Sequence, residues 1–396
     1  MLSEKILQSF EALRRYCEAE GFKGWDPYDG LNSRIFRAIP LAKRSALCRL
    51  AVIQGFKRFP FNLRRLALVP KQYNAKGIGL FLQGYCNMYR LVGKRPELAS
   101  RLGGSESIAA RVTELADLLL ALRCDGYSGA CWGYNFDWQA RRLFLFPKNT
   151  PTVVATTFCA TALIEAYGVT RRREYLDAAL SSAEFVMHDL HRSPSGRGFL
   201  FSYSPLPGND TVFNGSKLLA LCYKHTGRSE YLDAARKSVE ACCDAQRSDG
   251  SWPYGMLPVQ SWIDSFHTGY NLEALACYRD NTGDESFDGE LERGLTFYLG
   301  HFFEQDGTPK YYHDKTYPID IHCPGQLPVT LARIGRLGEH ADLAERVLCW
   351  AIDNMQSRKG YFYYQLKPGI SSRISYMRWS NAFMFNALSC YMLDVG

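Results

Sequence analysis

The stretch QRSDGSWPYG, residues 246–255, decides the fold because related versions of it return along the chain. It follows a helical pattern, turns at Asp249-Gly250, and continues into an extended aromatic segment; Asp and Gly are favoured turn residues. Four similar turns are marked by Gly126, Gly196, Gly307 and Gly360, so the five marker glycines are 70, 54, 57 and 53 residues apart. Self-similarity at such a period indicates a repeat architecture.

Each of these turns separates two helical patterns of different character. The preceding helix is amphipathic, as in SEYLDAARKSVEACCDAQ (229–246). The following helix carries small and apolar residues on most faces, as in FHTGYNLEALACYRDNTG (266–283), which indicates that it is buried. Glycines stop four of these buried helices: Gly168, Gly227, Gly283 and Gly338. Each repeat therefore combines an outer helix with an inner helix.

Six such pairs predict an all-α (α/α)6 toroid of six helical hairpins with short extended crossovers, forming a single domain over residues 1–396. The first inner helix is YNAKGIGLFLQGYCNMYRLVG (73–93), and we place its outer partner within residues 32–57. A helix over about residues 4–19 is then an extra, within an N-terminal helical extension over 1–31. An open solenoid is the alternative, although it requires polar capping repeats that a closed ring does not.

Composition narrows the class of protein. The chain is 46% hydrophobic and 14% aromatic, with a net charge of +7 and no basic run longer than residues 171–173, so we expect no nucleic-acid partner. Many of the 13 cysteines lie in apolar helical runs, which is typical of a reducing compartment. The N-terminus lacks the pattern of a signal peptide, and no apolar stretch approaches the ~18 residues of a membrane span. These features predict a cytoplasmic protein without membrane insertion.

The rim of the predicted toroid is the candidate active site, because crossovers and inner-helix N-termini lie at one end of such a ring. WIDSFHTGYN (262–271) and YPIDIHCPGQ (317–326) each place an acid and a histidine near a helix start. Glycosidases use two carboxyl groups about 5–9.5 Å apart across the scissile bond. The candidate catalytic residues are Asp210, Asp264, His267, Tyr270, Asp320 and His322. The simpler interpretation of the three acids is that they are helix N-caps.

The same rim is rich in aromatic, amide and basic side chains, a composition suited to binding sugars. The candidate substrate-binding residues are Trp132, Trp138, Asn149, Asn214, Trp252, Tyr254, Trp262, Asn271, Tyr312, Gln326, Arg378 and Trp379. For the aromatic members, packing within the rim is the alternative. The chain has no CxxC or HxxxH spacing and no glycine-rich phosphate loop, so we predict no metal site and no cofactor.

Several of these motifs resemble known families. The repeated outer helix, DGSWPYG turn and inner helix resemble the six-hairpin glycosidase superfamily. NDTVFNGSKLLALCYKHTGRSEYLDAA (209–235) is similar to the C-terminal domain of D-glucuronyl C5-epimerases, and SWIDSFHTGYNLEAL (261–275) resembles VpsJ-like exopolysaccharide-biosynthesis proteins. This resemblance spans residues 70–396 and implies a role in bacterial polysaccharide biosynthesis.

QRSDGSWPYG also resembles the QW motif of squalene–hopene-type cyclases, but their DxDD acid motif is absent. Lanthionine-cyclase-like proteins share the toroid, yet their zinc ligands are matched only at His322-Cys323.

These observations predict a carbohydrate-active enzyme that acts on a bacterial polysaccharide or oligosaccharide. The favoured reaction is glycoside hydrolysis by Asp264 and Asp320. The first alternative is a uronate-directed lyase or C5-epimerase, in which a tyrosine such as Tyr270 or Tyr312, with a histidine or Arg378, removes the C5 proton. The second alternative is a non-catalytic glycan-binding or scaffold protein of polysaccharide assembly.

Overall fold

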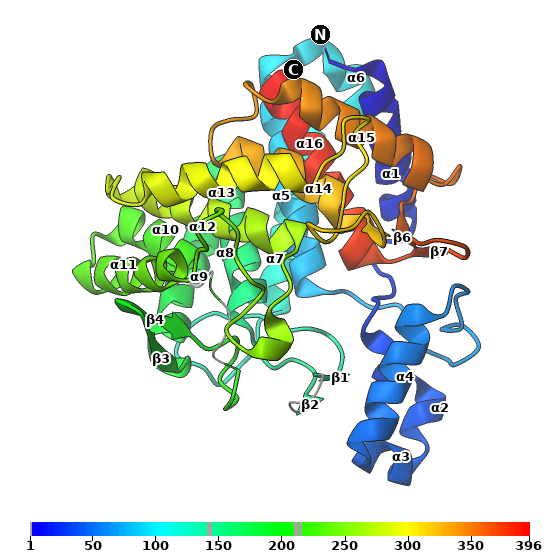
Figure 1. Ribbon diagram of the computed structural model, residues 1–396. Coiled ribbons are helices and arrows are strands. Elements are labelled where there is room, and N and C mark those ends of the chain that lie inside the picture. Colours follow the sequence, from blue (N-terminus) through cyan, green and yellow to red (C-terminus); the bar gives the residue numbers. More distant parts are fainter. Residues whose placement is uncertain (1, 141–144, 210–212, 214–215) are drawn as a thin grey trace.

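The computed structural model describes residues 2–140, 145–209, 213 and 216–396, which are mainly helical (Figure 1). The inner helices are α5 (Ala75–Lys94), α8 (Val153–Thr170), α10 (Ser216–Thr226), α12 (Ser265–Thr282), α14 (His322–Arg333) and α16 (Phe383–Val395). The outer helices are α1 (Glu4–Ala19), α7 (Ser105–Ala121), α9 (Arg173–Glu184), α11 (Ser229–Asp244), α13 (Asp288–His301) and α15 (Ala341–Met355).

The inner helices form a closed ring. Each contacts the next in chain order, and α16 contacts α5, so the last hairpin meets the first. The outer helices lie between neighbouring inner helices, as α9 does between α8 and α10. This arrangement confirms the predicted (α/α)6 toroid, and the open solenoid is ruled out.

The outer helix of the first pair differs from our expectation. Helix α1 contacts α15 and α16 and thereby occupies the sixth outer position, so it is part of the ring and not an extra. Its buried face includes Ile6, Phe10 and Leu13, and the Phe10 ring lies 4.8 Å from that of Phe385 on α16. The segment we had placed there, residues 32–57, instead contributes to a group of short helices beside the ring. Its helical periodicity was real, but Phe36 and Ile53 pack in a small separate cluster with Trp138, and Leu41 and Leu47 are exposed.

The marker glycines show why the opening motif repeats. Gly250, Gly307 and Gly360 all have positive φ angles, of 89°, 92° and 96°. A Cβ atom on each would lie 2.2–2.8 Å from a backbone oxygen of the next outer helix, at Arg293, Arg346 and Ala12 respectively. Each turn therefore packs directly on the neighbouring hairpin, which only glycine permits at this φ and spacing. The contact of Gly360 with α1 independently places α1 as the next outer helix of the ring.

This close approach predicts a stability difference between two glycines with similar backbones. Gly250→Ala is expected to lower the free energy of unfolding by about 2–4 kcal/mol, because a left-handed residue is strained and the Cβ collides with α13. Gly283→Ala is the matched control, since Gly283 has a φ of 75° and no atom within 4 Å of its Cβ position; it is expected to cost about 1–2 kcal/mol. Urea denaturation measures both values, and equal losses would contradict the packing role of Gly250.

Short elements complete the rim of the toroid. Three small antiparallel sheets pair β1 (Trp138–Gln139) with β2 (Leu145–Phe146), β3 (Arg192–Ser195) with β4 (Gly198–Phe201), and β5 (Ile319–Asp320) with β6 (Tyr363–Leu366) and β7 (Ser372–Ser375). The other helical segments are α2 (Arg34–Arg37), α3 (Pro40–Arg44), α4 (Ala46–Arg58), α6 (Ala99–Leu102), η1 (Asp29–Asn32), η2 (Pro96–Leu98), η3 (Phe185–Asp189), η4 (Pro258–Gln260) and η5 (Met377–Ala382).

Helix α8 corrects our statement that no apolar stretch approaches the length of a membrane span. By length and composition, its 18 residues pass as a candidate span. The helix is an inner member of the ring and 61% of it is buried. Its all-round apolar character therefore has a structural explanation, because it packs between α5, α7 and α9.

Candidate functional site

The N-termini of the inner helices carry the polar side chains of the candidate site. Asn74, Thr152 and Asp264 cap α5, α8 and α12, and each side chain accepts a hydrogen bond from a backbone N–H in the first turn. The N-cap interpretation of Asp264 is thus correct. Its carboxylate has further partners, which give it a second role.

Asp264 orients the imidazole of His267. The Nδ1 atom of His267 lies 2.9 Å from both carboxylate oxygens of Asp264, and the indole N–H of Trp262 donates to Oδ2 at 3.1 Å. The Asp264 side chain is buried, whereas that of His267 is 23% exposed. No residue that the structure describes bonds to Nε2 of His267. A histidine held through Nδ1 by a carboxylate, with Nε2 free, has the geometry of a general base.

Tyr270, one turn after His267 on α12, forms a second polar pair with His322 at the start of α14. The hydroxyl of Tyr270 lies 2.8 Å from Nε2 of His322. Burial raises the pKa of Tyr270 well above its usual value, so the phenol keeps its proton. Burial, followed by the charge of nearby Lys76, holds the pKa of His322 well below its usual value, so this imidazole is neutral. The Tyr270 ring centroid lies 5.7 Å from that of His267, so both pairs belong to one site.

One ring nitrogen of His322 lacks a hydrogen-bond partner among the described residues. This atom, Nδ1, is buried. The ring stacks on Phe266 with a centroid distance of 4.4 Å and also contacts Phe383. Proteins rarely leave a buried polar atom unpaired without a functional reason.

Asp320 is held by three donors. Its Oδ1 accepts from the backbone N–H of His322 at 3.0 Å and from the indole of Trp379 at 2.8 Å, and its Oδ2 accepts from Gln365 at 3.1 Å. Burial raises the pKa of Asp320 to about 6, against the lowering effect of these hydrogen bonds. Both oxygens are therefore engaged within the protein, as are both oxygens of Asp264. The two carboxylates are better suited to positioning their neighbours than to reaching a glycosidic bond.

Lys76, which the sequence analysis did not select, lies beside this site. Its side chain is 4% exposed, and its Nζ lies 4.0 Å from the ring centroid of Phe158 and 5.4 Å from that of Tyr270. Nζ forms no hydrogen bond or ion pair with the described residues. Burial lowers the pKa of Lys76 well below its usual value, and the charge of Arg378 lowers it further. An unpaired buried amine next to Tyr270 is suited to meeting negative charge on a ligand.

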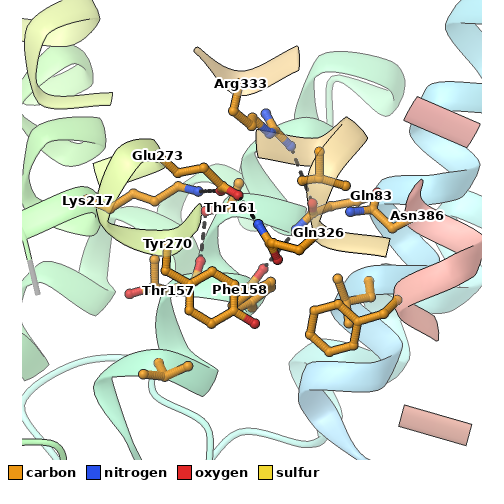
Figure 2. Close-up of a pocket in the computed structure, with 14 residues that line it drawn as sticks. Gln83, Thr157, Phe158, Thr161, Lys217, Tyr270, Glu273, Gln326, Arg333 and Asn386 are labelled. Carbon is orange, nitrogen blue, oxygen red and sulfur yellow. Dashed lines mark hydrogen bonds and ion pairs between the residues drawn. The ribbon is translucent and has the colours of Figure 1, made fainter. Parts of the chain in front are cut away.

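An axial cavity extends from Tyr270 into the ring of inner helices (Figure 2). Its volume is about 40 Å³, enough for a few water molecules, and side chains of five inner helices besides α12 line it. Lys217 donates to Glu273 at 2.6 Å, and Gln326 bonds to both Glu273 and Thr330. Threonine hydroxyls, amides and aromatic rings alternate around the wall, as in pockets that bind small polar molecules.

The structure brings one group of candidates together and separates others from it. Tyr254 stacks on Trp262 at 4.5 Å and contacts His267, and Trp379 contacts His322. Trp132 and Trp252 are 0% and 2% exposed and donate to backbone carbonyls of Leu119 and Cys242, so both belong to the packing. The remaining candidates lie as follows: Trp138 stacks on Phe146, Asn149 is exposed, Asn271 is buried on α12, Tyr312 bridges to Asp264, and Gln326 faces the axial cavity.

The last three candidates are Arg378, Asp210 and Asn214. Arg378 is buried and binds Asp26 through two hydrogen bonds of 2.5 and 2.8 Å, so its charge is already balanced. Asp210 and Asn214 lie outside the residues that the structure describes. Three charged residues at buried positions were not predicted: Asp26, Lys76 and Glu273. Lys76 and Glu273 lie within inner helices that are otherwise buried, and a charged residue in such a helix could have indicated a functional position.

Comparison with known proteins supports the fold. A scan of protein-family models finds no match, and neither does a search of curated proteins. Solved structures do match. A sugar epimerase from a ruminal bacterium shares 12% identity at a TM-score of 0.58, over 83% of this chain and 90% of that chain. A family 76 glycoside hydrolase (mannosidase) from Bacteroides thetaiotaomicron shares 13% at 0.57, over 84% and 89%.

A third match is an unsaturated glucuronyl hydrolase specific for heparin. It shares 14% identity at a TM-score of 0.55, over 80% of this chain and 85% of that chain. The chain therefore has the (α/α)6 toroid fold that these epimerases and hydrolases use. At such identities the likeness shows the fold, and the reaction is argued from the site.

Proposed function

We propose that the protein is a carbohydrate-active enzyme that removes a proton from a carbon atom of a sugar, as sugar epimerases and uronate lyases do. An epimerase then returns a proton to that carbon, whereas a lyase expels the oxygen on the adjacent carbon. The observation that carries the proposal is the pair of proton-transfer groups at the rim, His267 held by Asp264 and Tyr270 joined to His322. The sugar epimerase among the similar structures supports it. This choice favours the first alternative of the sequence analysis over hydrolysis.

Each residue then has a role in the reaction. His267 accepts the carbon-bound proton at Nε2, and the carboxylate of Asp264 stabilises the imidazolium that forms. Tyr270 donates a proton from its hydroxyl, to the same carbon in an epimerase or to the departing oxygen in a lyase, with His322 as its hydrogen-bonded partner. When the carbon lies next to a carbonyl or carboxyl group, removal of its proton leaves negative charge on the oxygen of that group. Lys76 is the nearby amine that meets this charge, in a buried setting where electrostatic interactions are strong.

The substrate class we propose is the terminal sugar of a bacterial polysaccharide or oligosaccharide. The sugar would lie at the rim, where polar and aromatic side chains around Tyr270 lead into the axial cavity. Tyr254 and Trp262, stacked on each other beside His267, offer an aromatic surface to a second unit outside it. Aromatic and amide groups in this arrangement bind the apolar faces and the hydroxyls of sugars.

Hydrolysis remains the second candidate, because one observation favours it. The pKa of Asp320 is raised to about 6, and a raised pKa is the property that a glycosidase requires of its acid. Hydrolysis is the weaker candidate because both oxygens of Asp320 are already hydrogen-bonded to the protein. A non-catalytic glycan-binding role is the third candidate.

Product analysis tests the proposal. The protein is incubated with a panel of acidic and neutral bacterial polysaccharides and their oligosaccharides. New reducing ends, the absorbance of unsaturated uronates, and the epimer ratio by NMR are measured together. An epimer or an unsaturated product is expected. New reducing ends without unsaturation, lost in Asp320→Asn and retained in His267→Gln, would contradict the proposal and establish hydrolysis. Binding without any product would favour the non-catalytic role.

A further inference from the structure

The residues before the first inner helix have a one-sided charge. Between positions 30 and 96 the chain has no Asp or Glu, although the whole protein has 40 acidic residues. Within this stretch we define the basic lobe as residues 33–71. It carries ten basic residues: Arg34, Arg37, Lys43, Arg44, Arg49, Lys57, Arg58, Arg64, Arg65 and Lys71.

The basic lobe stands apart from the ring of helices. Figure 1 shows α2, α3 and α4 projecting beside the toroid, on the side where β1 and β2 lie. A small apolar cluster joins the lobe to η1: Phe36 and Ile53 of the lobe pack with Leu31 of η1, and Trp138 lies against them. Helix α4 contacts η1 and β1, which joins the lobe to the rim. The lobe is therefore held beside the mouth of the candidate site.

The outer surface of the lobe is apolar to an unusual degree. Of the 15 exposed large hydrophobic side chains in the described part of the chain, eight lie between residues 35 and 68. Leu41, Leu47 and Leu66 are 81%, 79% and 76% exposed, and Phe61 is 69% exposed. The others are Ile35, Ile39, Phe59 and Leu68. Soluble monomers rarely collect exposed apolar residues in one place unless the surface binds something.

Several cations of the lobe have no counter-charge in the protein. Arg34, Lys43, Arg44, Arg58 and Arg65 are exposed, and none forms an ion pair with the residues that the structure describes. Lys43 and Arg44 end α3, between the exposed leucines at positions 41 and 47. Apolar and cationic side chains thus alternate over the same short helices. This is the composition of helices that lie in the interface of an anionic membrane.

We propose that the basic lobe is a docking surface for an anionic lipid membrane, with α3 and α4 in the headgroup region and the exposed leucines among the acyl chains. Charge complementarity argues for this occupant over a second copy of the chain, whose equally basic lobe would repel it. The exposed apolar residues are mainly leucine and isoleucine, which insert into lipid but do not stack on nucleic-acid bases. No residue of the lobe needs to cross the bilayer.

Membrane docking would also orient the enzyme. Because α4 contacts β1 at the rim, a protein docked through the lobe holds its crossovers close to the membrane surface. The mouth of the candidate site then faces glycans attached to or emerging from that surface. This inference does not depend on which reaction the site performs.

Flotation of the full-length protein with vesicles tests the docking surface. Phosphatidylcholine vesicles are compared with vesicles that contain phosphatidylglycerol as a third of their lipid. Binding is expected only with phosphatidylglycerol and should weaken as salt rises, since salt screens the attraction. Lys43→Gln with Arg44→Gln should lower the affinity roughly 10- to 30-fold. Leu41→Asn with Leu47→Asn should lower it at least about tenfold.

A matched control lies in the turn after α15. Arg358→Gln with Lys359→Gln neutralises another exposed adjacent basic pair. These control substitutions should leave vesicle binding as it is in the unmodified protein. The proposal is overturned if the protein does not float with phosphatidylglycerol vesicles at low salt, or if the lobe variants bind as well as the control. It is also overturned if the leucine variants abolish a dimer, or if RNA binds the lobe more tightly than vesicles do.

Discussion

His267→Gln is expected to lower the rate of proton transfer by about 10²- to 10⁴-fold, the usual contribution of a general base. Glutamine keeps the backbone N–H that donates to Asp264 at 2.9 Å, so the helix cap survives. It removes the basic Nε2 that the site offers to a substrate. Turnover is measured by NMR on the substrate that the product panel identifies, and folding is checked by circular dichroism.

A matched control separates this role from a general effect of removing histidine. His301→Gln replaces an exposed histidine in the last turn of outer helix α13, whose ring contacts Phe297 and none of the candidate catalytic residues that the structure describes, and should leave turnover unchanged. Tyr270→Phe removes only the hydroxyl that meets His322 and should also lower turnover at least about 100-fold. Full activity in both His267→Gln and Tyr270→Phe would contradict the assignment of the site.

Asp26→Ala is expected to cost about 3–5 kcal/mol of the free energy of unfolding, the second large effect. Asp26 and Arg378 are each nearly fully buried, with side-chain exposures of 5% and 4%, and they join the N-terminal segment to η5. Removing the carboxylate leaves the guanidinium of Arg378 buried without its counter-charge. Urea denaturation followed by tryptophan fluorescence measures the loss.

An exposed ion pair provides the control for this prediction. Arg173 and Asp177 lie 2.8 Å apart on α9, but their side chains are 66% and 57% exposed. Asp177→Ala should cost no more than about 1 kcal/mol, because water screens this pair. If Asp26→Ala is no more harmful than Asp177→Ala, the buried pair does not hold the N-terminal segment to the ring.

The toroid was predictable because backbone requirements leave a mark in the sequence. Gly250, Gly307 and Gly360 combine a positive φ with a close approach to the next outer helix, so no other residue serves there. The inner helices were recognisable because burial on all sides makes them apolar on all sides. The turn glycines and the apolar inner helices together identify the successive hairpins from the sequence alone.

The first outer helix was assigned incorrectly for a physical reason. Residues 34–58 do form helices, and their apolar residues repeat at helical spacing. The sequence does not show whether the apolar face of a helix packs inside the protein or remains on its surface for a partner. Leu41 and Leu47 are exposed, whereas Ile6 and Phe10 of α1 are buried. The absence of acidic residues from this segment was the signal that distinguished the two.

The candidate site was only partly predictable. The spacing of Asp264 and His267 within one helical turn anticipated their contact, because three residues separate neighbours on a helix. The partners of Asp320 come from Gln365 and Trp379, in later segments, so its engagement with three donors depended on tertiary structure. Lys76 was overlooked because a single lysine near a helix start is usually solvated.

Hydrogen exchange at carbon tests the central claim most directly. The protein is incubated in D₂O with the sugar that the product panel identifies, and deuterium bound to carbon is measured by mass spectrometry. Our account predicts either solvent deuterium at one carbon of an epimerised sugar or the loss of one carbon-bound hydrogen in an unsaturated product, abolished in His267→Gln and retained in His301→Gln. Turnover of the same sugar with neither deuterium at a carbon nor an unsaturated product would contradict the account and show that no carbon-bound proton is removed.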